Sequence, residues 1–329
     1  MSVDIVLPWV DGNDPNWQNI KKEYRGYGDT RPERYRDFGI LKYVFRGIET
    51  CMPWVRTVHF VTMDQIPEWM NTEYKRLHLV DHRDYMPSDC LPTFNSNAIE
   101  MNFHRIEGLS EQFLLFNDDF FPLRPTEETD WFQDGMPVDM LALQPIVANA
   151  DNEVMSYIYL NNAIVIARHF NKLANMKQQP KAYFHPSYPL QYLVYNNLER
   201  LWPRYTGFFT VHGPSPLLKS ALEELWEKEP EVMETVSHNR FRAKTDVNQY
   251  LVREYIKQKG TFVPKNVLKH FRYFELSDQN EALYECLRKK QASVICINDG
   301  NHSFDADTAA LRLRECFDAL FPQKSKFEK

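Results

Sequence analysis

The sequence lacks the features that mark disulfide-rich secreted proteins, membrane-spanning proteins and nucleic-acid coats. Its five cysteines are scattered and odd in number, without any CxxC spacing, so neither a disulfide framework nor a zinc site is indicated. No apolar run approaches the roughly 18 residues that cross a bilayer, and the N-terminus lacks the basic-then-apolar layout of a signal peptide. A formal net charge of −6 is unsuited to binding nucleic acid. We therefore expect a cytoplasmic protein that binds no nucleic acid and associates at most peripherally with a membrane, at its inner face.

A GxGxxG phosphate loop, internal repeats and low-complexity segments are also absent. The 329 residues, 43% of them hydrophobic, suffice for one large α/β domain with insertions or for two small ones. Short apolar runs alternate with helical patterns, which predicts a Rossmann-like α/β fold with a mainly parallel sheet and helical insertions in the second half. The predicted strands are residues 4–10, 58–62, 77–80, 113–116, 139–143 and 293–297.

One short helix is predicted to begin at Asn97, because Glu100 follows at the spacing of a capping box and Gly108 can end the helix. Glu100 and His104 fall on one face of this helix. The plain interpretation of Glu100 is a cap for backbone N–H groups; the alternative is an acid or base in a site. The buried stripe of the same helix comprises Ile99, Phe103 and Ile106.

Acidic residues follow the predicted strand 113–116 at its carboxyl end, as Asn117, Asp118 and Asp119. Ligands bind at this edge of open α/β sheets, and neighbouring carboxylates repel one another unless a cation or a proton separates them. An Mg²⁺ or Mn²⁺ ion that also binds a phosphate oxygen fits this requirement, whereas a solvated turn is the alternative. The strand predicted at 293–297 ends in the same way, with Asp299.

Two segments of the first half offer groups for a nucleotide. One is the turn after the first predicted strand, and the other is the N-terminus of a helix with buried positions between 41 and 48, where backbone N–H groups favour an anion. Solvated charges are the alternative for the second segment. The residues concerned are Asp11, Gly12, Asn13, Arg36, Asp37 and Lys42.

The second half adds a histidine and a basic group. His212 precedes a rigid Gly-Pro turn and is either a positioned acid or base or an ordinary loop residue. Ser215 is predicted to cap a helix that begins at Pro216. The basic group precedes another predicted helix and is suited to a diphosphate; it comprises Arg240, Arg242 and Lys244.

Taken in this order, these segments resemble the Stealth family. Its members are bacterial capsule and cell-surface polysaccharide hexose-1-phosphate transferases, related to the catalytic subunit of the animal lysosomal N-acetylglucosamine-1-phosphotransferase. The resemblance covers nearly the whole chain and rests on four blocks of sequence. They include DIVLPWVDGNDP at 4–15, RDFG at 36–39 with LPTFNSNAIE at 91–100 and FNDD at 116–119, HGP at 212–214 with SHNRFR at 237–242, and CIND at 296–299.

The resemblance implies catalytic roles for Glu100, Asp119, His212 and Arg242, and a glycosyltransferase-A-like form of the Rossmann-like fold. The chain has Asp11 where the animal enzyme has asparagine. It also lacks the large regulatory and recognition modules of that enzyme, which favours a glycan acceptor over a protein acceptor.

The reaction implied is the transfer of a sugar 1-phosphate from a UDP-hexose or UDP-N-acetylhexosamine to a hydroxyl of a saccharide or lipid-linked oligosaccharide, with release of UMP. We expect Mg²⁺ (or Mn²⁺) on Asp119, assisted by Asp118 or Asp299, and Arg242 on the transferred phosphate. His212 or Glu100 would take the acceptor's proton. A metal-dependent glycosyltransferase that releases UDP and a non-catalytic glycan-binding protein are the alternatives.

A single catalytic domain is expected over residues 1–329. Residues 1–150 would form the nucleotide- and metal-binding half, 151–290 a largely helical part for the acceptor and the phosphate, and 291–329 a closing strand and helix. The residues expected to bind substrate are Asp11, Gly12, Asn13, Arg36, Asp37, Lys42, Asn95, Asn97, His104 and Arg240.

Overall fold

A five-stranded sheet forms the centre of the molecule in the computed structural model, which describes residues 2–24, 38–299 and 304–329. The strand order is β3-β2-β1-β4-β8; the first four strands are parallel, and β8 is antiparallel to β4. The chain therefore moves outward from β1 in both directions, which makes the gap between β1 and β4 a topological switch point. The strands are β1 (Val3–Pro8), β2 (Val58–Thr62), β3 (Leu77–Asp81), β4 (Gln112–Leu115) and β8 (Ser215–Leu218).

Side chains of the central strands alternate between two hydrophobic cores. In β1, Ile5 and Leu7 point into the first core and Val6 into the second; in β4, Leu114 and Leu115 divide in the same way. Because successive side chains of a strand point to opposite faces, a strand that is apolar at every position must be covered on both sides. The apolar runs of the sequence therefore place this sheet inside the molecule.

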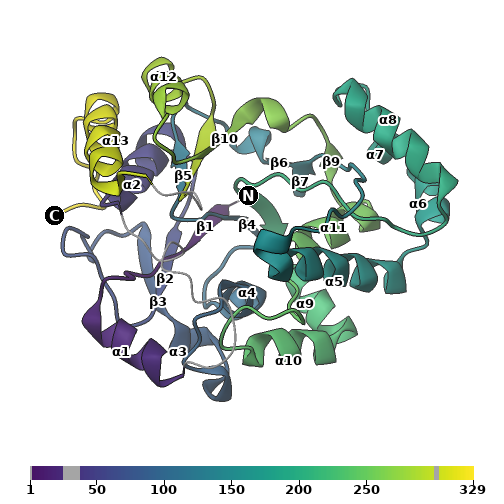
Figure 1. Cartoon of the computed structure of the whole chain (residues 1–329), viewed down its shortest axis with the longest axis horizontal. Coiled ribbons are helices and arrows are strands. Elements are labelled where there is room, and N and C mark those ends of the chain that lie inside the picture. The colour runs from purple at the N-terminus through teal and green to yellow at the C-terminus, as the bar shows by residue number, and fades with distance from the viewer. Residues whose placement is uncertain (1, 25–37, 300–303) are drawn as a thin grey trace.

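Helices cover both faces of the sheet (Figure 1). The first core packs against α2 (Leu41–Cys51), α12 (Glu281–Lys289) and α13 (Ala306–Leu320). The second packs against α4 (Ser96–Met101), α5 (Glu153–His169), α9 (Lys219–Lys228), α10 (Pro230–His238) and α11 (Gln249–Lys259). The remaining helices are α1 (Pro15–Glu23), α3 (His82–Tyr85), α6 (Lys172–Gln178), α7 (Pro180–Tyr183) and α8 (Leu190–Leu198).

A second sheet brings the end of the chain to the end of β4. Its order is β10 (Phe271–Glu275), β11 (Val294–Asn298) and β5 (Phe120–Pro122), and β11 runs antiparallel to β5 with Cys296 opposite Phe120. Since β5 begins directly after Asp119, this register carries the fourth sequence block to the acidic strand end. A third, small sheet comprises β6 (Phe132–Gln133), β7 (Met136–Asp139) and β9 (Val263–Pro264).

Most predicted strands are confirmed, and three predictions about strand bounds and helix caps are wrong. The strand expected at 139–143 ends at Asp139, and only an isolated bridge from Leu143 to Phe208 follows. Ser215 caps no helix, because Ser215–Leu218 pairs with β4 as a strand. Asn97 does not cap α4; the side chain of Asn95 accepts the N–H of Asn97 instead.

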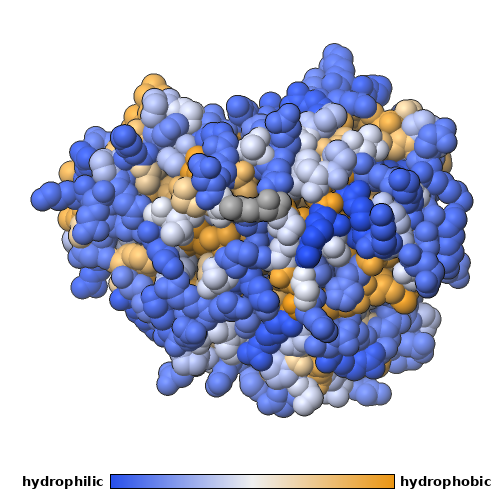
Figure 2. All heavy atoms as spheres, turned by 180° about the vertical axis from the view of Figure 1, so that it is seen from behind, coloured by the Kyte–Doolittle hydropathy of each residue, from blue (hydrophilic) through white to orange (hydrophobic). Residues whose placement is uncertain are grey.

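The surface is mostly hydrophilic, with apolar residues in separate patches (Figure 2). Across the described ranges, none of the helices combines the length and the apolar character needed to span a bilayer.

We predict that Gly47→Ala destabilises the fold. Gly47 lies inside α2, and a Cβ at this position would come 2.6 Å from the carbonyl oxygen of Pro122 in β5. Alanine favours a helix over glycine by about 1 kcal/mol, but overpacking costs about 1–3 kcal/mol, so we expect a net loss measured by urea denaturation. Thr50→Ala, exposed in the same helix, is the control and should change stability by under about 0.5 kcal/mol. Equal stabilisation by both variants would contradict the close contact.

Candidate active site

The turn after β1 is held rigidly at the switch point. The side-chain amide of Gln65 accepts the N–H of Asp11 (2.9 Å) and donates to the Asp11 carbonyl (3.1 Å) and to a carboxylate oxygen of Asp14 (2.9 Å). The Asp11 carboxylate accepts the N–H of Asn13 (2.8 Å), and the Gly12 carbonyl accepts the amide of Gln18. The turn is thus preorganised, with Asn13 exposed.

Of the predicted anion site at the N-terminus of α2, Lys42 lies within the described residues. It lies in the first turn of α2, with its Nζ 5.0 Å from the ring centroid of Tyr43. The cap residue Ile40 makes no side-chain hydrogen bond to this helix end. Arg36 and Asp37 lie outside the described residues, and their roles stay predictions.

Asp119 lies between β4 and β5 and is surrounded by groups from two distant segments. Its Oδ2 is 3.2 Å from Sγ of Cys296 and 3.8 Å from Nε2 of His212. Burial, and then the charge of Asp119, hold the pKa of the Cys296 thiol well above its usual range, so the thiol donates to the carboxylate. The other oxygen, Oδ1, is buried and has no hydrogen-bond partner within the described part of the chain.

His212 is oriented by helix α11. Its Nδ1 lies 3.0 Å from the hydroxyl of Tyr250, and its ring contacts the rings of Phe120 and Tyr273 at centroid distances of 5.4 and 5.8 Å. One turn further along α11, Arg253 donates to the carbonyl of the residue before the histidine, at 3.1 Å, while also paired with the buried Asp139. The backbone and the ring of His212 are thus both fixed by the same helix.

Glu100 is buried, and it lies near His212 and Arg242. Burial raises the pKa of its carboxyl to about 7, and this effect is opposed by the positive charge of Arg242, by a hydrogen bond from the N–H of Gln249, and by His212. Gln249 is the first residue of α11, so the carboxylate lies at the N-terminus of the helix that orients His212. A carboxyl with a pKa near neutral pH is suited to accept and release a proton.

Arg242 lies in a loop that a buried carboxylate holds against α4. The Arg242 guanidinium donates to Oγ of Ser96, the first residue of α4, at 2.7 Å. Asp246 accepts from the amides of Asn95 (2.9 Å) and Asn97 (3.0 Å) and from the N–H of Ala243 (3.0 Å). Asn95 and Asn97, predicted to bind substrate, are therefore buried and bonded to Asp246, and the geometry gives them a supporting position behind Arg242.

Two other predicted substrate-binding residues have partners of their own. Arg240 donates to the carbonyl of Pro92 and lies over the ring of Tyr24 at 4.9 Å. His104 packs against the ring of Trp226 at a centroid distance of 5.7 Å, and burial lowers the pKa of its imidazole to about 4. Because α4 ends at Met101, His104 does not continue the helix of Glu100 as the sequence predicted.

Two groups of side chains could hold a metal ion within the described ranges. In the first, the ligand atoms of Asp119, His212 and Cys296 lie within 4.8 Å of one another; the second comprises Asp89, Cys90 and His238. Asp118 is exposed and Asp299 partly buried, and neither belongs to the first group. The unpartnered oxygen of Asp119 fits a hard cation such as Mg²⁺ or Mn²⁺. The protonated thiol of Cys296 does not.

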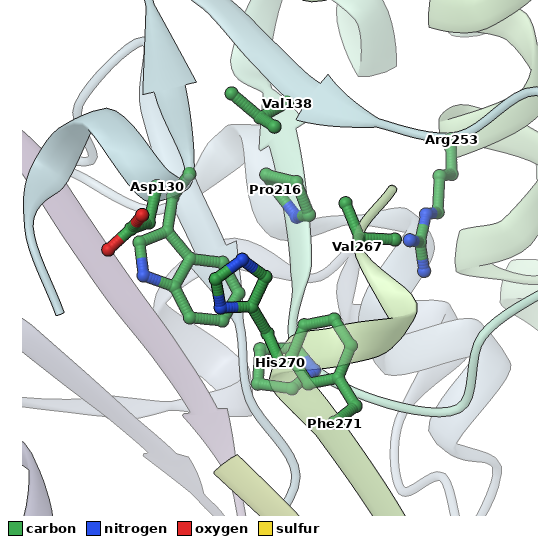
Figure 3. A pocket seen from close by; sticks show the side chains of 9 residues that line it. Asp130, Val138, Pro216, Arg253, Val267, His270 and Phe271 are labelled. Atoms are coloured by element: carbon green, nitrogen blue, oxygen red, sulfur yellow. The ribbon is translucent and has the colours of Figure 1, made fainter. Parts of the chain in front are cut away.

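Figure 3 shows a small pocket whose lining includes Pro214, a residue of the turn that follows His212. Its volume of about 10 Å³ fits roughly one water molecule, so it cannot receive a sugar nucleotide. Its lining includes Pro214, Pro216, Trp131, Phe271 and the side chain of Arg253. This pocket therefore belongs to the packing that supports the His212 turn.

Sequence reasoning missed several residues that complete this cluster. Tyr250 gave no signal, because a tyrosine in a helix is most often a core residue. Cys296 belongs to the fourth sequence block and Asp246 follows the third, and the sequence predicts a role for neither. Only the register of β11 and the fold of the 239–246 loop reveal their contacts. Ser96 lies within the 91–100 motif, but its sequence position gave no sign of its contact with Arg242, which depends on the fold of the loop.

A mainly parallel sheet covered by helices, with titratable side chains gathered at its switch point, is the arrangement typical of α/β enzymes. The matched family models are described as Stealth protein CR1, conserved region 1, over residues 1–29, and Stealth protein CR2, conserved region 2, over residues 34–139. These matches, together with 34–36% identity over the whole chain to curated polysaccharide phosphotransferases, show that the chain belongs to the Stealth family and is a phosphotransferase.

Two curated relatives match it over almost their whole length. The chain is 34% identical to the capsular polysaccharide phosphotransferase WcwK of Streptococcus pneumoniae, over 100% of this chain and 99% of that protein. It is 36% identical to the receptor polysaccharide phosphotransferase WefC of Streptococcus oralis, over 99% of each. The match to the solved structure of the galactosyltransferase LgtC in complex with donor and acceptor sugar analogs covers 98% of both chains, with 11% identity and a TM-score of 0.41.

We predict that the stability of Glu100→Gln relative to the unchanged protein depends on pH. A folded pKa near 7, against 4.5 for an ordinary glutamate, means that the folded state holds its proton more tightly. As pH rises from 4.5 to 7, the free energy of unfolding of the unchanged protein therefore falls by up to about 3 kcal/mol because of Glu100. The glutamine variant lacks this loss. Denaturation at pH 4.5 and pH 8 measures the difference.

The control for this prediction is Glu107→Gln, at an exposed position. Its free energy of unfolding, relative to that of the unchanged protein, should be the same at both pH values. If this relative stability changed with pH equally in both variants, or did not change in Glu100→Gln, the raised pKa of Glu100 would be contradicted.

Proposed function

We propose that the protein transfers a sugar 1-phosphate from a nucleotide-diphosphate sugar, a UDP-hexose or UDP-N-acetylhexosamine, to a hydroxyl of a saccharide in cell-surface polysaccharide synthesis. The observation that carries this proposal is the convergence of Glu100, Asp119, His212 and Arg242, from four separated segments, in a chain similar over its whole length to polysaccharide phosphotransferases. The acceptor oxygen attacks the phosphorus that bears the sugar. The bond from phosphorus to the oxygen of UMP breaks, and UMP leaves.

The switch point between β1 and β4 is where the donor would bind. The rigid turn Asp11–Asn13 and the acidic end of β4 flank it, as expected for ligands of open α/β sheets. Lys42 would add positive charge at the N-terminus of α2. Arg242 would bind the transferred phosphate, since a guanidinium matches two phosphate oxygens.

A divalent cation, Mg²⁺ or Mn²⁺, would neutralise diphosphate charge at this edge. Asp119 would hold it through Oδ1, which has no hydrogen-bond partner among the described residues, with Asp118 or Asp299 assisting.

The contact between Tyr250 and His212 favours Glu100 as the base. Burial holds the pKa of Tyr250 well above its usual range, so the hydroxyl keeps its proton. Within the described part of the chain, the one hydrogen-bond acceptor recorded for this hydroxyl is Nδ1 of His212. An imidazole that accepts at Nδ1 carries its own proton on Nε2, where it donates and cannot take a proton. His212 would then donate a hydrogen bond to the phosphate, and Glu100 would receive the proton of the acceptor hydroxyl.

The nucleotide product tests the proposed reaction. Incubation with UDP-sugars, Mg²⁺ or Mn²⁺ and saccharide acceptors should release UMP and form a phosphodiester, as read by chromatography and ³¹P NMR. Arg242→Ala should lower kcat by about 10²–10³ without lowering Tm, because it removes charge stabilisation in the transition state. Arg312→Ala, an exposed arginine of α13, is the control. Release of UDP would establish a glycosyltransferase instead.

We predict that Tyr250→Phe lowers kcat roughly ten- to a hundredfold at nearly constant KM, because it frees His212 to change tautomer. Tyr255→Phe removes the same group from the same helix, where the hydroxyl bonds Glu224 and Lys228, and should leave kcat unchanged. The ¹⁵N NMR signals of His212, identified by their loss in His212→Gln, report the tautomer directly. A proton on Nδ1 in the unchanged protein would make His212 the base.

A further inference from the structure

Helix α8 presents an apolar stripe to solvent. Leu190, Val194 and Leu198 recur at every fourth position, which places them on one face, and Leu201 and Trp202 follow directly after the helix. Leu190 is 76% exposed and Leu201 74%, and the others are exposed by 45–49%. In Figure 1, α8 lies at the outer edge of the molecule, far from β1. In Figure 2, seen from behind, hydrophobic residues stand at the corresponding upper left edge.

The inner side of α8 is fixed to the body of the protein. Asn196 is completely buried; it accepts the N–H of Leu143 (2.8 Å) and donates to the carbonyls of Leu141 (3.0 Å) and Tyr183 (2.6 Å). These bonds leave the helix no freedom to rotate its apolar stripe inward. The exposed stripe is therefore a permanent feature of the surface, and such patches mark interaction sites.

The exposed charged side chains of the segment that carries the stripe are all positive. Residues 170–206 contain one acidic side chain, Glu199, and it is buried, accepting from Lys172 at 2.6 Å and from Thr206 at 2.6 Å. The exposed charged side chains of this segment are Lys177, Lys181, Arg200 and Arg204. This basic surface lies on a chain whose formal net charge is −6. The overall negative charge therefore masks a segment whose exposed charges have the opposite sign.

We propose that α8 and the segment to Arg204 form a peripheral docking site for an anionic membrane surface. Leucine and tryptophan side chains would enter the boundary between headgroups and acyl chains, while lysine and arginine bind anionic headgroups. A second copy of the chain fits this surface poorly, because a two-fold contact would bring the same four cations against one another. Docking would hold the active site near lipid-linked saccharides, a consequence that rests on the proposed function, whereas the docking itself does not.

Flotation of the full-length protein with lipid vesicles tests the proposal. Binding is expected to vesicles of three parts phosphatidylcholine to one part phosphatidylglycerol, to weaken as salt rises, and to be absent on pure phosphatidylcholine. Arg200→Glu with Arg204→Glu should weaken binding at least about tenfold, and so should Leu190→Ser with Leu201→Ser. Leu311→Ser, which changes an exposed leucine (52%) of α13 far from α8 in sequence, is the control and should bind normally.

Circular dichroism and Tm should be unchanged in all these variants, because the substituted side chains are exposed. Absence of flotation, or flotation that both α8 double variants retain, would overturn the proposal. A dimer in solution that Leu190→Ser with Leu201→Ser disrupts, without vesicle binding, would assign the stripe to self-association and overturn it too. Turnover of a water-soluble acceptor should be unaffected by the α8 variants, so failure of the proposed chemistry and failure of docking give different results.

Discussion

The N-terminal turns of α11 are the support on which the candidate site depends. The first N–H of the helix meets the Glu100 carboxylate, the Tyr250 hydroxyl meets the His212 ring, and Arg253 holds the backbone before that histidine. These contacts come from successive turns of one rigid element, so the two candidate proton-transfer groups keep a fixed relation to one another. An active site gains from such preorganisation, because its groups need not reorganise during the reaction.

Burial of the Glu100 carboxylate in this region costs free energy. Glu100 is buried with only partial compensation, so its charged form is disfavoured and its pKa moves towards neutrality. Asp246 shows the other way to bury a carboxylate: amides of three asparagines and a backbone N–H surround it. A fully bonded carboxylate fixes a loop, whereas a poorly bonded one remains available to react. Burial raises the pKa of Asp246 too, but its hydrogen bonds oppose that rise and fix the loop, whereas Glu100 has fewer such bonds.

Much of the fold followed from the sequence, because strands buried on both faces show as continuous apolar runs. The strand at 58–62 has the predicted bounds, and the strands near 4–10, 77–80, 113–116 and 293–297 are shifted by a few residues at most. The errors arose where long-range pairing decided the outcome. Ser215 and Pro216 carry a helix-start signal, but pairing with β4 makes them a strand. Asn97 has the spacing of a cap, but its amide bonds Asp246 from a segment almost 150 residues away.

The sequence alone singled out four candidate site residues and the kinds of element on which they lie: Glu100 on a short helix, Asp119 after a buried strand, His212 at a proline turn and Arg242 before a helix. Periodicity and turn chemistry are local, so a linear sequence expresses them directly. Only the tertiary structure decided that these four meet, that Tyr250 orients His212, and that Cys296 donates to Asp119. Those contacts depend on strand order and register, which follow from the packing of the whole chain and not from any one segment.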